Sequence, residues 1–247
     1  MVFKKKMINI RDKYIFTHVE KTAGTSMAFE LQKNHLGYIY YIATNFADRD
    51  RKGTLQLAPL EEMKDNYPNK HVELEGFKPF MPEHEWDQFF KFAFVRNPLD
   101  RLVSLYVHIV STYFKTEGRI TAQDILTRKP EIIFEMPNLD GSGILTHYEV
   151  TFDFFARHFS NRGLHNQVKQ LSDQKGNIIT NFTGKFENLE ADWKKVCEKI
   201  KIAPNLPKKN MSEGTKGLYK QFYTDDLKEF IYDRDNEDFE RLGYEKI

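Results

Sequence analysis

Short apolar stretches, separated by polar turns, recur along the first half of the sequence. Residues 14–19 are a β-prone run that ends in a polar turn containing glycine, and a helical pattern begins at Ser26. Residues 92–95 are a continuous apolar run, which is typical of a strand buried on both faces. The succession of strand, loop and helix predicts a parallel sheet covered by helices.

Capping and spacing signals define the helices better than the apolar runs do. Asn97 is a good N-cap and Pro98 suits a first helical turn, so a helix is predicted from about Leu99 past Tyr106. Residues 190–200 place apolar side chains on one face at helical spacing, and a terminal helix is expected to be capped near Thr224. Further strands are predicted at 38–43, 71–74 and 178–186, and a further helix at 152–159.

These patterns predict the fold class. We expect an α/β protein with a P-loop-like central parallel sheet flanked by helices, in a single domain over residues 1–247. Residues 112–150 are less regular, and they contain several prolines and glycines.

Composition excludes some classes of function. The 37 Lys and Arg residues nearly balance the 36 Asp and Glu residues, so the net charge gives no indication of a nucleic-acid partner. The single cysteine, Cys197, rules out an internal disulfide and permits a reducing compartment. Because no run of 18 apolar residues and no signal-peptide pattern occurs, we expect a soluble cytoplasmic protein without a transmembrane segment.

The first chemical motif is residues 20–26, Glu-Lys-Thr-Ala-Gly-Thr-Ser, between a predicted strand and a helix. A loop in this position directs backbone N–H groups and a helix N-terminus at one point, while Lys21 adds a full positive charge. Gly24 allows an anion to approach closely, and Thr25 and Ser26 supply hydroxyl donors. The motif predicts a phosphate site, although it lacks the G-x-x-x-x-G-K-[ST] pattern of a Walker A loop. An ordinary capped turn is the alternative.

The second motif follows the buried run at residues 92–95. Arg96 is expected at the carboxyl end of that strand, where open α/β sheets bind ligands, and Ser104 lies on the next helix. A guanidinium and a hydroxyl group suit a second phosphate. In the alternative reading, Arg96 pairs with a carboxylate such as that of Asp100, and Ser104 lies on the helix surface.

Together the two motifs resemble those of the sulfotransferase superfamily, in the branch of the Golgi carbohydrate enzymes and their bacterial relatives. Residues 18–26 resemble that family's 5′-phosphosulfate loop, and residues 94–106 resemble its 3′-phosphate motif. Residues 184–193 and 223–244 are also similar to that branch. Glu20 is a departure, because family loops often have proline there.

The resemblance implies a donor, 3′-phosphoadenosine-5′-phosphosulfate (PAPS), whose product is the bisphosphate PAP. The 5′-phosphosulfate would be held by Lys21, Thr22, Ala23, Gly24, Thr25 and Ser26. Arg96 and Ser104 would hold the 3′-phosphate. Lys21 would also stabilise charge on the leaving phosphate in an in-line sulfuryl transfer, and no metal takes part.

The acceptor hydroxyl needs a general base. In the carbohydrate branch this base commonly lies between the two phosphate motifs, and here we choose His71, with Glu73 in reserve. A surface histidine in a polar turn is the alternative reading of His71, whereas His18 is expected to be a core residue.

The acceptor expected from the resemblance is a carbohydrate, a glycolipid or a small glycoside, bound partly by residues 112–150. Residues 208–216 form a basic loop that either contacts the nucleotide or an anionic acceptor, or is simply solvated. We expect a bacterial-type enzyme, with a role in membrane-associated glycan biosynthesis left open, and the oligomeric state is not predicted. A P-loop-type nucleotide-dependent kinase and a non-catalytic module that binds nucleotides or sulfated glycans remain alternatives.

Overall fold

The computed structural model describes residues 7–9, 11–34, 39–40, 74–75, 78, 83–113, 121–128, 133–137, 145–149, 151–158, 166–206 and 217–247. The chain divides into two compact units. The sheet unit comprises Met1–Arg96 and His165–Met211, and the helical unit comprises Asn97–Leu164 and Ser212–Ile247. The single domain expected over residues 1–247 stays a prediction.

A five-stranded sheet, in the order β3-β1-β2-β4-β7, forms the centre of the sheet unit. The strands are β1 (Met7–Asn9), β2 (Tyr14–Thr17), β3 (Ile39–Tyr40), β4 (Phe90–Val95) and β7 (Phe182–Lys185). Strands β2, β4 and β7 are parallel, whereas β1 runs antiparallel to both β2 and β3. The α/β class with a P-loop-like parallel centre is confirmed, and the antiparallel pairs at one edge were not anticipated.

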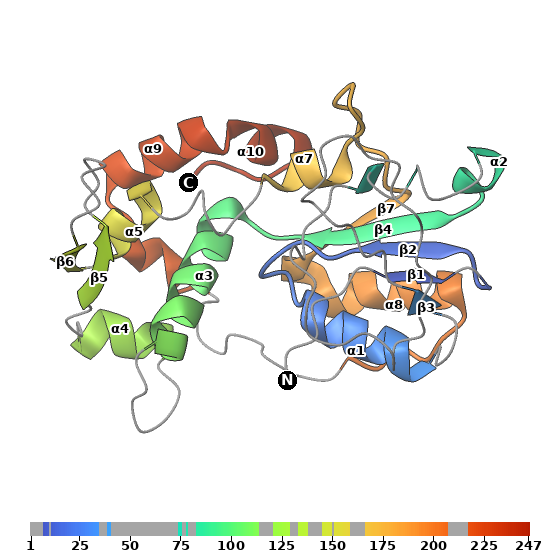
Figure 1. The fold of residues 1–247 in the computed structure, drawn as a ribbon, viewed down its shortest axis with the longest axis horizontal. Coiled ribbons are helices and arrows are strands. Elements are labelled where there is room, and N and C mark those ends of the chain that lie inside the picture. Colours follow the sequence, from blue (N-terminus) through green and yellow to red (C-terminus); the bar gives the residue numbers. More distant parts are fainter. Residues whose placement is uncertain are drawn as a thin grey trace. The chain divides into compact units, whose positions relative to one another are not determined.

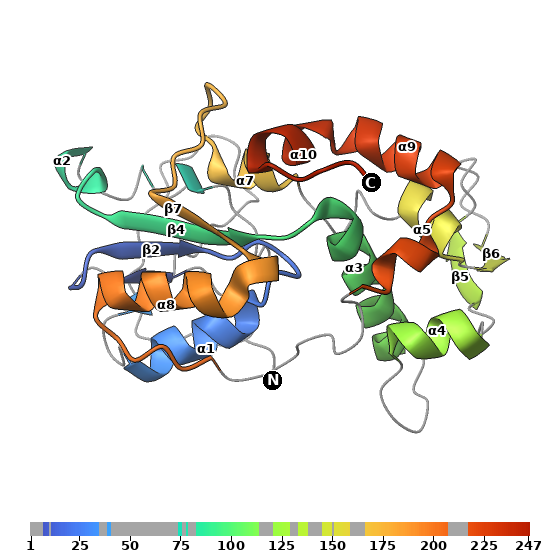
Figure 2. The same cartoon turned by 180° about the vertical axis from the view of Figure 1, so that it is seen from behind.

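Helices cover both faces of this sheet. Helices α1 (Gly24–Asn34) and α8 (Leu189–Ile200) lie together on one face, and α7 (Gln167–Leu171) lies on the other (Figures 1 and 2). Because side chains alternate along a strand, Phe16 and Phe92 face the helices α1 and α8, while Ile15 joins an apolar cluster with Trp86 and Phe89. Trp86 ends the short helix α2 (Glu83–Trp86).

The register of β4 against β7 explains a glycine within the sheet. Gly184 pairs with Phe94, and a Cβ atom at Gly184 would lie 2.5 Å from the ring of Phe94. The ring of Phe94 therefore packs directly over the backbone of β7, close to Trp193 of α8. The helical spacing predicted for residues 190–200 is confirmed, since Trp193, Val196 and Cys197 are all buried.

The helical unit is built around α3 (Pro98–Tyr113). Its other elements are α4 (Ala122–Arg128), β5 (Ile133–Pro137), β6 (Leu145–Glu149), α5 (Phe152–His158), the 3₁₀ helix η4 (Tyr219–Phe222), α9 (Asp225–Arg234) and α10 (Asn236–Leu242). The Asn97 side chain accepts hydrogen bonds from the N–H groups of Leu99 (3.0 Å) and Asp100 (3.4 Å), so the predicted N-cap is confirmed. Thr224 likewise caps α9, accepting from the N–H of Leu227 at 3.2 Å.

Aromatic side chains hold the helical unit together. Tyr106 of α3 packs against Phe152, Phe155 and Phe222, with ring centroids 5.2–6.5 Å apart. Residues 112–150, which the sequence pattern left irregular, contain α4 and an antiparallel hairpin of β5 and β6. The strand predicted at 71–74 lies outside the described residues, except for Leu74, which is in a 3₁₀ turn.

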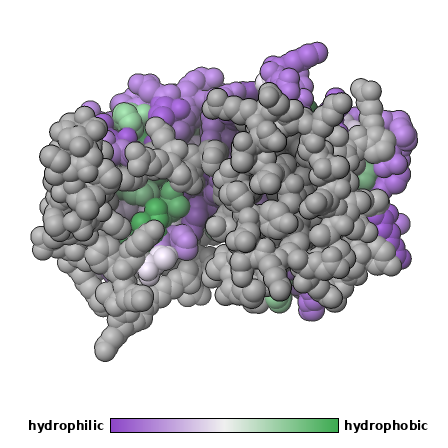
Figure 3. Space-filling model, in the orientation of Figure 1, coloured by the Kyte–Doolittle hydropathy of each residue, from purple (hydrophilic) through white to green (hydrophobic). Residues whose placement is uncertain are grey.

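Apolar side chains are gathered into these cores. The large apolar residues that are exposed in the described part of the chain are Phe29 and Ile247. The described surface visible in Figure 3 is mainly hydrophilic, with hydrophobic residues in a limited area. No helix in the described ranges has both the length and the apolar character needed to cross a membrane.

Candidate functional site

The turn between β2 and α1 contains two non-glycine residues in the left-handed region. Lys21 has φ 63° and Ala23 has φ 65°. Each such residue costs about 1–3 kcal/mol, and strain of this kind persists where the surrounding structure enforces it, often at ligand sites. The loop predicted to bind phosphate is therefore a strained turn between the end of a parallel strand and a helix N-terminus.

The N-terminus of α1 presents backbone N–H groups at the end of the turn. The carbonyl of Ala23 accepts hydrogen bonds from the N–H groups of Ser26 (3.0 Å) and Met27 (3.2 Å), which starts the helix. The N–H groups of Gly24 and Thr25 donate to no acceptor within the described part of the chain, and the first turn contains no acidic residue. The helix dipole and these two donors favour negative charge at this point.

The loop side chains divide between structure and possible ligand contact. The Thr22 hydroxyl is buried and donates to the carbonyl of Val19 at 2.9 Å, so this residue can offer a ligand only its backbone. Thr25 is exposed and Lys21 is half-buried, which leaves both within reach of solvent. Ser26 is buried in the first turn of α1.

Gly24 has a packing role that the sequence did not reveal. A Cβ atom at this position would lie 1.8 Å from Cδ2 of His18, because the imidazole ring packs against the start of α1. The same ring stacks on Phe16, with centroids 6.1 Å apart and planes at 19°. His18, which was expected to be a core residue, is half-buried beneath the loop.

Arg96 follows β4 directly and is 2% exposed. Its Nη1 donates to the carbonyl of Lys21 at 3.1 Å, and its guanidinium lies 4.0 Å from the ring centroid of Phe186. The two predicted phosphate motifs are thus in contact within the sheet unit, through the Arg96 side chain and the backbone of the loop. A guanidinium that lies against an aromatic face gains a cation–π interaction, which offsets part of the cost of its burial.

The remaining residues of the second motif belong to the helical unit. Ser104 is buried on α3, so it is not the solvent-facing residue of the alternative reading. Arg101 is also buried, and its Nη1 lies 4.0 Å from Oδ2 of Asp238 on α10. Tyr223 donates its hydroxyl to the carbonyl of Leu99 at 2.8 Å, and burial raises its pKa well above the ordinary value.

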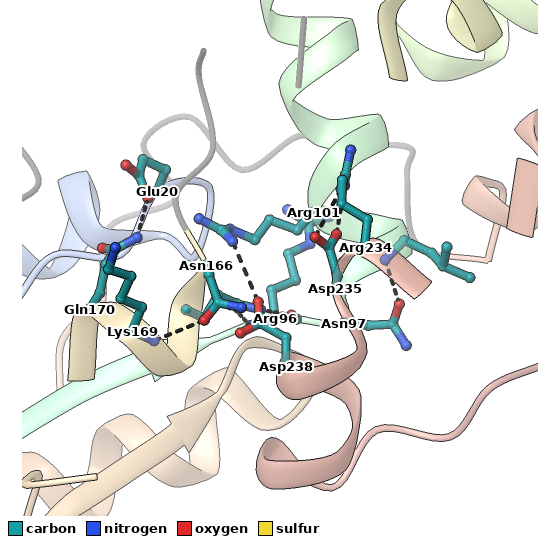
Figure 4. Close-up of polar contacts among 12 residues, drawn as sticks. Glu20, Arg96, Asn97, Arg101, Asn166, Lys169, Gln170, Arg234, Asp235 and Asp238 are labelled. Carbon is teal, nitrogen blue, oxygen red and sulfur yellow. Dashed lines mark hydrogen bonds and ion pairs between the residues drawn. The ribbon is translucent and has the colours of Figure 1, made fainter. Parts of the chain in front are cut away.

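Two glutamines on α7 belong to the site, and sequence reasoning missed them. Gln167 hydrogen-bonds the backbone of Arg96. Gln170 donates to the carboxylate of Glu20, as Figure 4 shows. They lie 71 and 150 residues away in sequence from these partners, and no local pattern distinguishes them.

The candidate bases and the basic loop were not placed. His71, Glu73 and the residues 208–216 lie outside the described residues. Within the described ranges, no group of three or more His, Cys, Asp or Glu side chains is arranged to hold a metal ion.

Comparisons with known proteins assign the chain to a family. Neither the curated proteins nor the solved structures contain a significant match to this chain. The profile of the sulfotransferase family matches residues 5–245, which include both phosphate motifs, helix α7 and the C-terminal helices. The chain therefore belongs to the sulfotransferase family, whose members transfer sulfuryl groups.

Proposed function

We propose that this protein transfers the sulfuryl group of PAPS to a hydroxyl group of a carbohydrate acceptor and releases PAP. The kinase alternative loses its support, because the family transfers sulfuryl and not phosphoryl groups. The observation that carries the proposal is the contact of Arg96 with the carbonyl of Lys21. This contact brings a buried cation next to a strained loop at a helix N-terminus. PAPS carries phosphate groups at both its 5′ and its 3′ end, and the two features would each bind one of them.

The loop has the groups that a 5′-phosphosulfate needs. The N–H groups of Gly24 and Thr25 and the dipole of α1 attract negative charge, and the hydroxyl of Thr25 is exposed beside them. Lys21 would supply the full charge that balances the leaving phosphate. Arg96 would contact the 3′-phosphate, while the part of Ser104, in the helical unit, stays a prediction.

Sulfuryl transfer breaks the bond between sulfur and the bridging oxygen of the 5′-phosphate. The acceptor oxygen forms the new bond to sulfur, its proton passes to the general base, and the electron pair of the broken bond remains on PAP. Charge develops on the bridging oxygen in the transition state, so Lys21 acts mainly on turnover. His71, or Glu73 in its place, would accept the proton.

A carbohydrate acceptor is favoured by the branch that the motifs resemble. The polar residues between 112 and 150 can hydrogen-bond a polyhydroxylated ligand, whereas a steroid pocket is mainly apolar. The candidate acceptors are glycans, glycolipids and small glycosides.

The purified protein should be incubated with PAPS and panels of saccharides, phenols and sterols, with PAP release and acceptor mass measured together. We expect a sulfated saccharide, activity that survives EDTA, and a turnover number at least about 10²-fold lower in Lys21→Ala. Lys175→Ala, an exposed site in the sheet unit, is the matched loss of a lysine and should retain activity.

Sulfation of phenols or sterols with no modified saccharide would overturn the acceptor and leave the donor standing. Failure to release PAP with any acceptor, together with no PAP binding by calorimetry, would overturn the proposed function as a whole.

A further inference from the structure

Helix α7 contacts both predicted phosphate motifs, at Glu20 and at Arg96, although neither motif includes a residue of this helix. We propose that its two glutamines, Gln167 and Gln170, are positioning residues that set Arg96 and the loop for the nucleotide. This inference rests on the proposed function, and it adds residues that do not touch the nucleotide themselves.

Gln167 holds the peptide backbone at Arg96 through both ends of its amide. Its Nε2 donates to the carbonyl of Arg96, and its Oε1 accepts from the N–H of Arg96, each at 2.9 Å. The side chain of Gln167 is fully buried, so it is shielded from competing water. A two-point contact of this kind fixes the direction of the chain just after β4, and hence the direction in which the Arg96 side chain leaves it.

Gln170 holds the other motif. Its Nε2 donates to Oε2 of Glu20 at 3.0 Å, and Glu20 and Gln170 are 7% and 1% exposed (Figure 4). A buried carboxylate is costly unless it is hydrogen-bonded, so this contact accounts for the acidic residue in front of an anion-binding loop. The carboxylate is directed to α7 and anchors the residue next to Lys21.

Helix α7 is short but well anchored. Asn166 caps it by accepting from the N–H of Lys169 at 2.8 Å, and the hydroxyl of Ser172 donates to the carbonyl of Val168 at 2.8 Å. Val168 and Leu171 are buried, and the carbonyl of Leu171 accepts from the N–H of Ile179 at 2.9 Å. Gln167 and Gln170 are three residues apart, which places them on one side of the helix.

The contacts form a closed ring. Gln167 binds the backbone of Arg96, Arg96 donates to the carbonyl of Lys21, and Glu20, the neighbour of Lys21, accepts from Gln170. Each phosphate motif is therefore fixed twice, once to the other and once to α7. This redundancy stabilises the positive φ angles at Lys21 and Ala23, which the loop would otherwise tend to relax.

The test uses variants that remove one side of the ring at a time. Gln167→Met loses both hydrogen bonds to Arg96 while keeping a side chain of similar size. Gln170→Glu places two carboxylates together, and the exchange Glu20→Gln with Gln170→Glu restores an amide–carboxylate hydrogen bond in the opposite direction. Ser172→Ala removes a buried hydrogen bond of α7 that contacts neither motif, and serves as the matched control.

Calorimetry with PAP and ADP separates positioning from general destabilisation. Gln167→Met should weaken the binding of PAP about tenfold and the binding of ADP less, because Arg96 would contact the 3′-phosphate that ADP lacks. Gln170→Glu should weaken both nucleotides by similar factors of about ten, and the exchanged pair should recover most of that loss. Wild-type affinities in Gln167→Met and Gln170→Glu, or an equal loss in Ser172→Ala, would overturn the proposal.

Amide hydrogen exchange of the nucleotide-free protein gives a readout that does not depend on the donor. Faster exchange of residues 20–24 in Gln170→Glu, reversed in the exchanged pair and missing in Ser172→Ala, supports the positioning role even if PAP fails to bind the wild type. Unchanged exchange in Gln170→Glu would contradict it.

Discussion

At the scale of single residues, Arg96 has two roles in the proposed site. Its side chain is poised beside the loop as a buried cation, and it also donates to the carbonyl of Lys21. Removing the side chain would therefore affect more than the proposed 3′-phosphate contact, because the loop that would bind the 5′ end loses one of its anchors.

We expect Arg96→Ala to weaken the binding of PAP by at least about tenfold and the binding of ADP by a smaller factor. The difference between the two losses would measure the proposed 3′-phosphate contact, since a hydrogen bond between charged groups contributes about 1.5–3 kcal/mol. Calorimetry with both nucleotides measures it, and Arg96→Lys should recover little because lysine cannot reproduce the planar donor. Equal losses for PAP and ADP would show that Arg96 only supports the loop.

His71 is the residue on which the assignment of proton transfer depends. We expect His71→Ala to lower turnover by about 10²–10⁴-fold with PAP affinity nearly unchanged, because a general base acts on the acceptor and not on the donor. The wild-type rate should rise with pH through an ionisation near neutrality, which the variant lacks. A nearly normal His71→Ala and an inactive Glu73→Ala would transfer the role to Glu73, with His84→Ala, an exposed histidine, as the control.

At the scale of elements, two arginines of the second motif, Arg96 and Arg101, have different surroundings. Arg101 lies five residues after Arg96, yet it is buried against Asp238 of α10. The presence of Arg101 in the motif is thus explained by packing within the helical unit.

We expect Arg101→Met to lower the free energy of unfolding by about 3–5 kcal/mol, because it removes the positive charge that lies beside the buried carboxylate of Asp238. The double variant with Asp238→Asn should regain part of this loss, since the buried negative charge is then removed as well. Urea unfolding measures both. PAP affinity of the folded single variant should stay near the wild-type value, and a tenfold loss would instead assign Arg101 to the nucleotide.

At the scale of the whole molecule, the core of the sheet unit protects the only cysteine. Cys197 is fully buried on α8, in the cluster that includes Phe92 and Trp193. Burial is the main cause that raises its pKa from 9.0 to about 12, and the charges of Glu30 and Glu198 add to the effect. The thiol therefore stays protonated and shielded until the unit unfolds.

We expect Cys197 to react with a thiol reagent only as fast as the protein unfolds. Rapid labelling of the native protein at pH 8 would contradict the burial.

Burial of the thiol should also make the stability depend on pH. Above pH 9 the unfolded chain loses the thiol proton before the folded one does, so the free energy of unfolding should fall as the pH rises toward about 12. This single group contributes at most about 1.4 kcal/mol per pH unit, measured as the difference in slope between the wild type and Cys197→Ala.

The sequence by itself determined the local architecture around the site. The apolar run at residues 92–95, the cap at Asn97 and the spacing of residues 190–200 all act over a few residues, so their outcome can be read from the chain. The strand, loop and helix around residues 14–34 follow for the same reason. Strand β1 escaped prediction because it has three residues and forms only through its pairing with β2 and β3.

Only the tertiary structure decided which side chains hold the site in place. Glu20 departs from the proline that is common in family loops, and its carboxylate accepts a hydrogen bond from Gln170, 150 residues later in the sequence. Arg96 and Gln167 meet across 71 residues, and the guanidinium of Arg101 lies beside the carboxylate of Asp238, which is far away in the sequence. Buried polar groups must find partners, but which partner is near depends on how the strands and helices pack, and no local pattern carries that information.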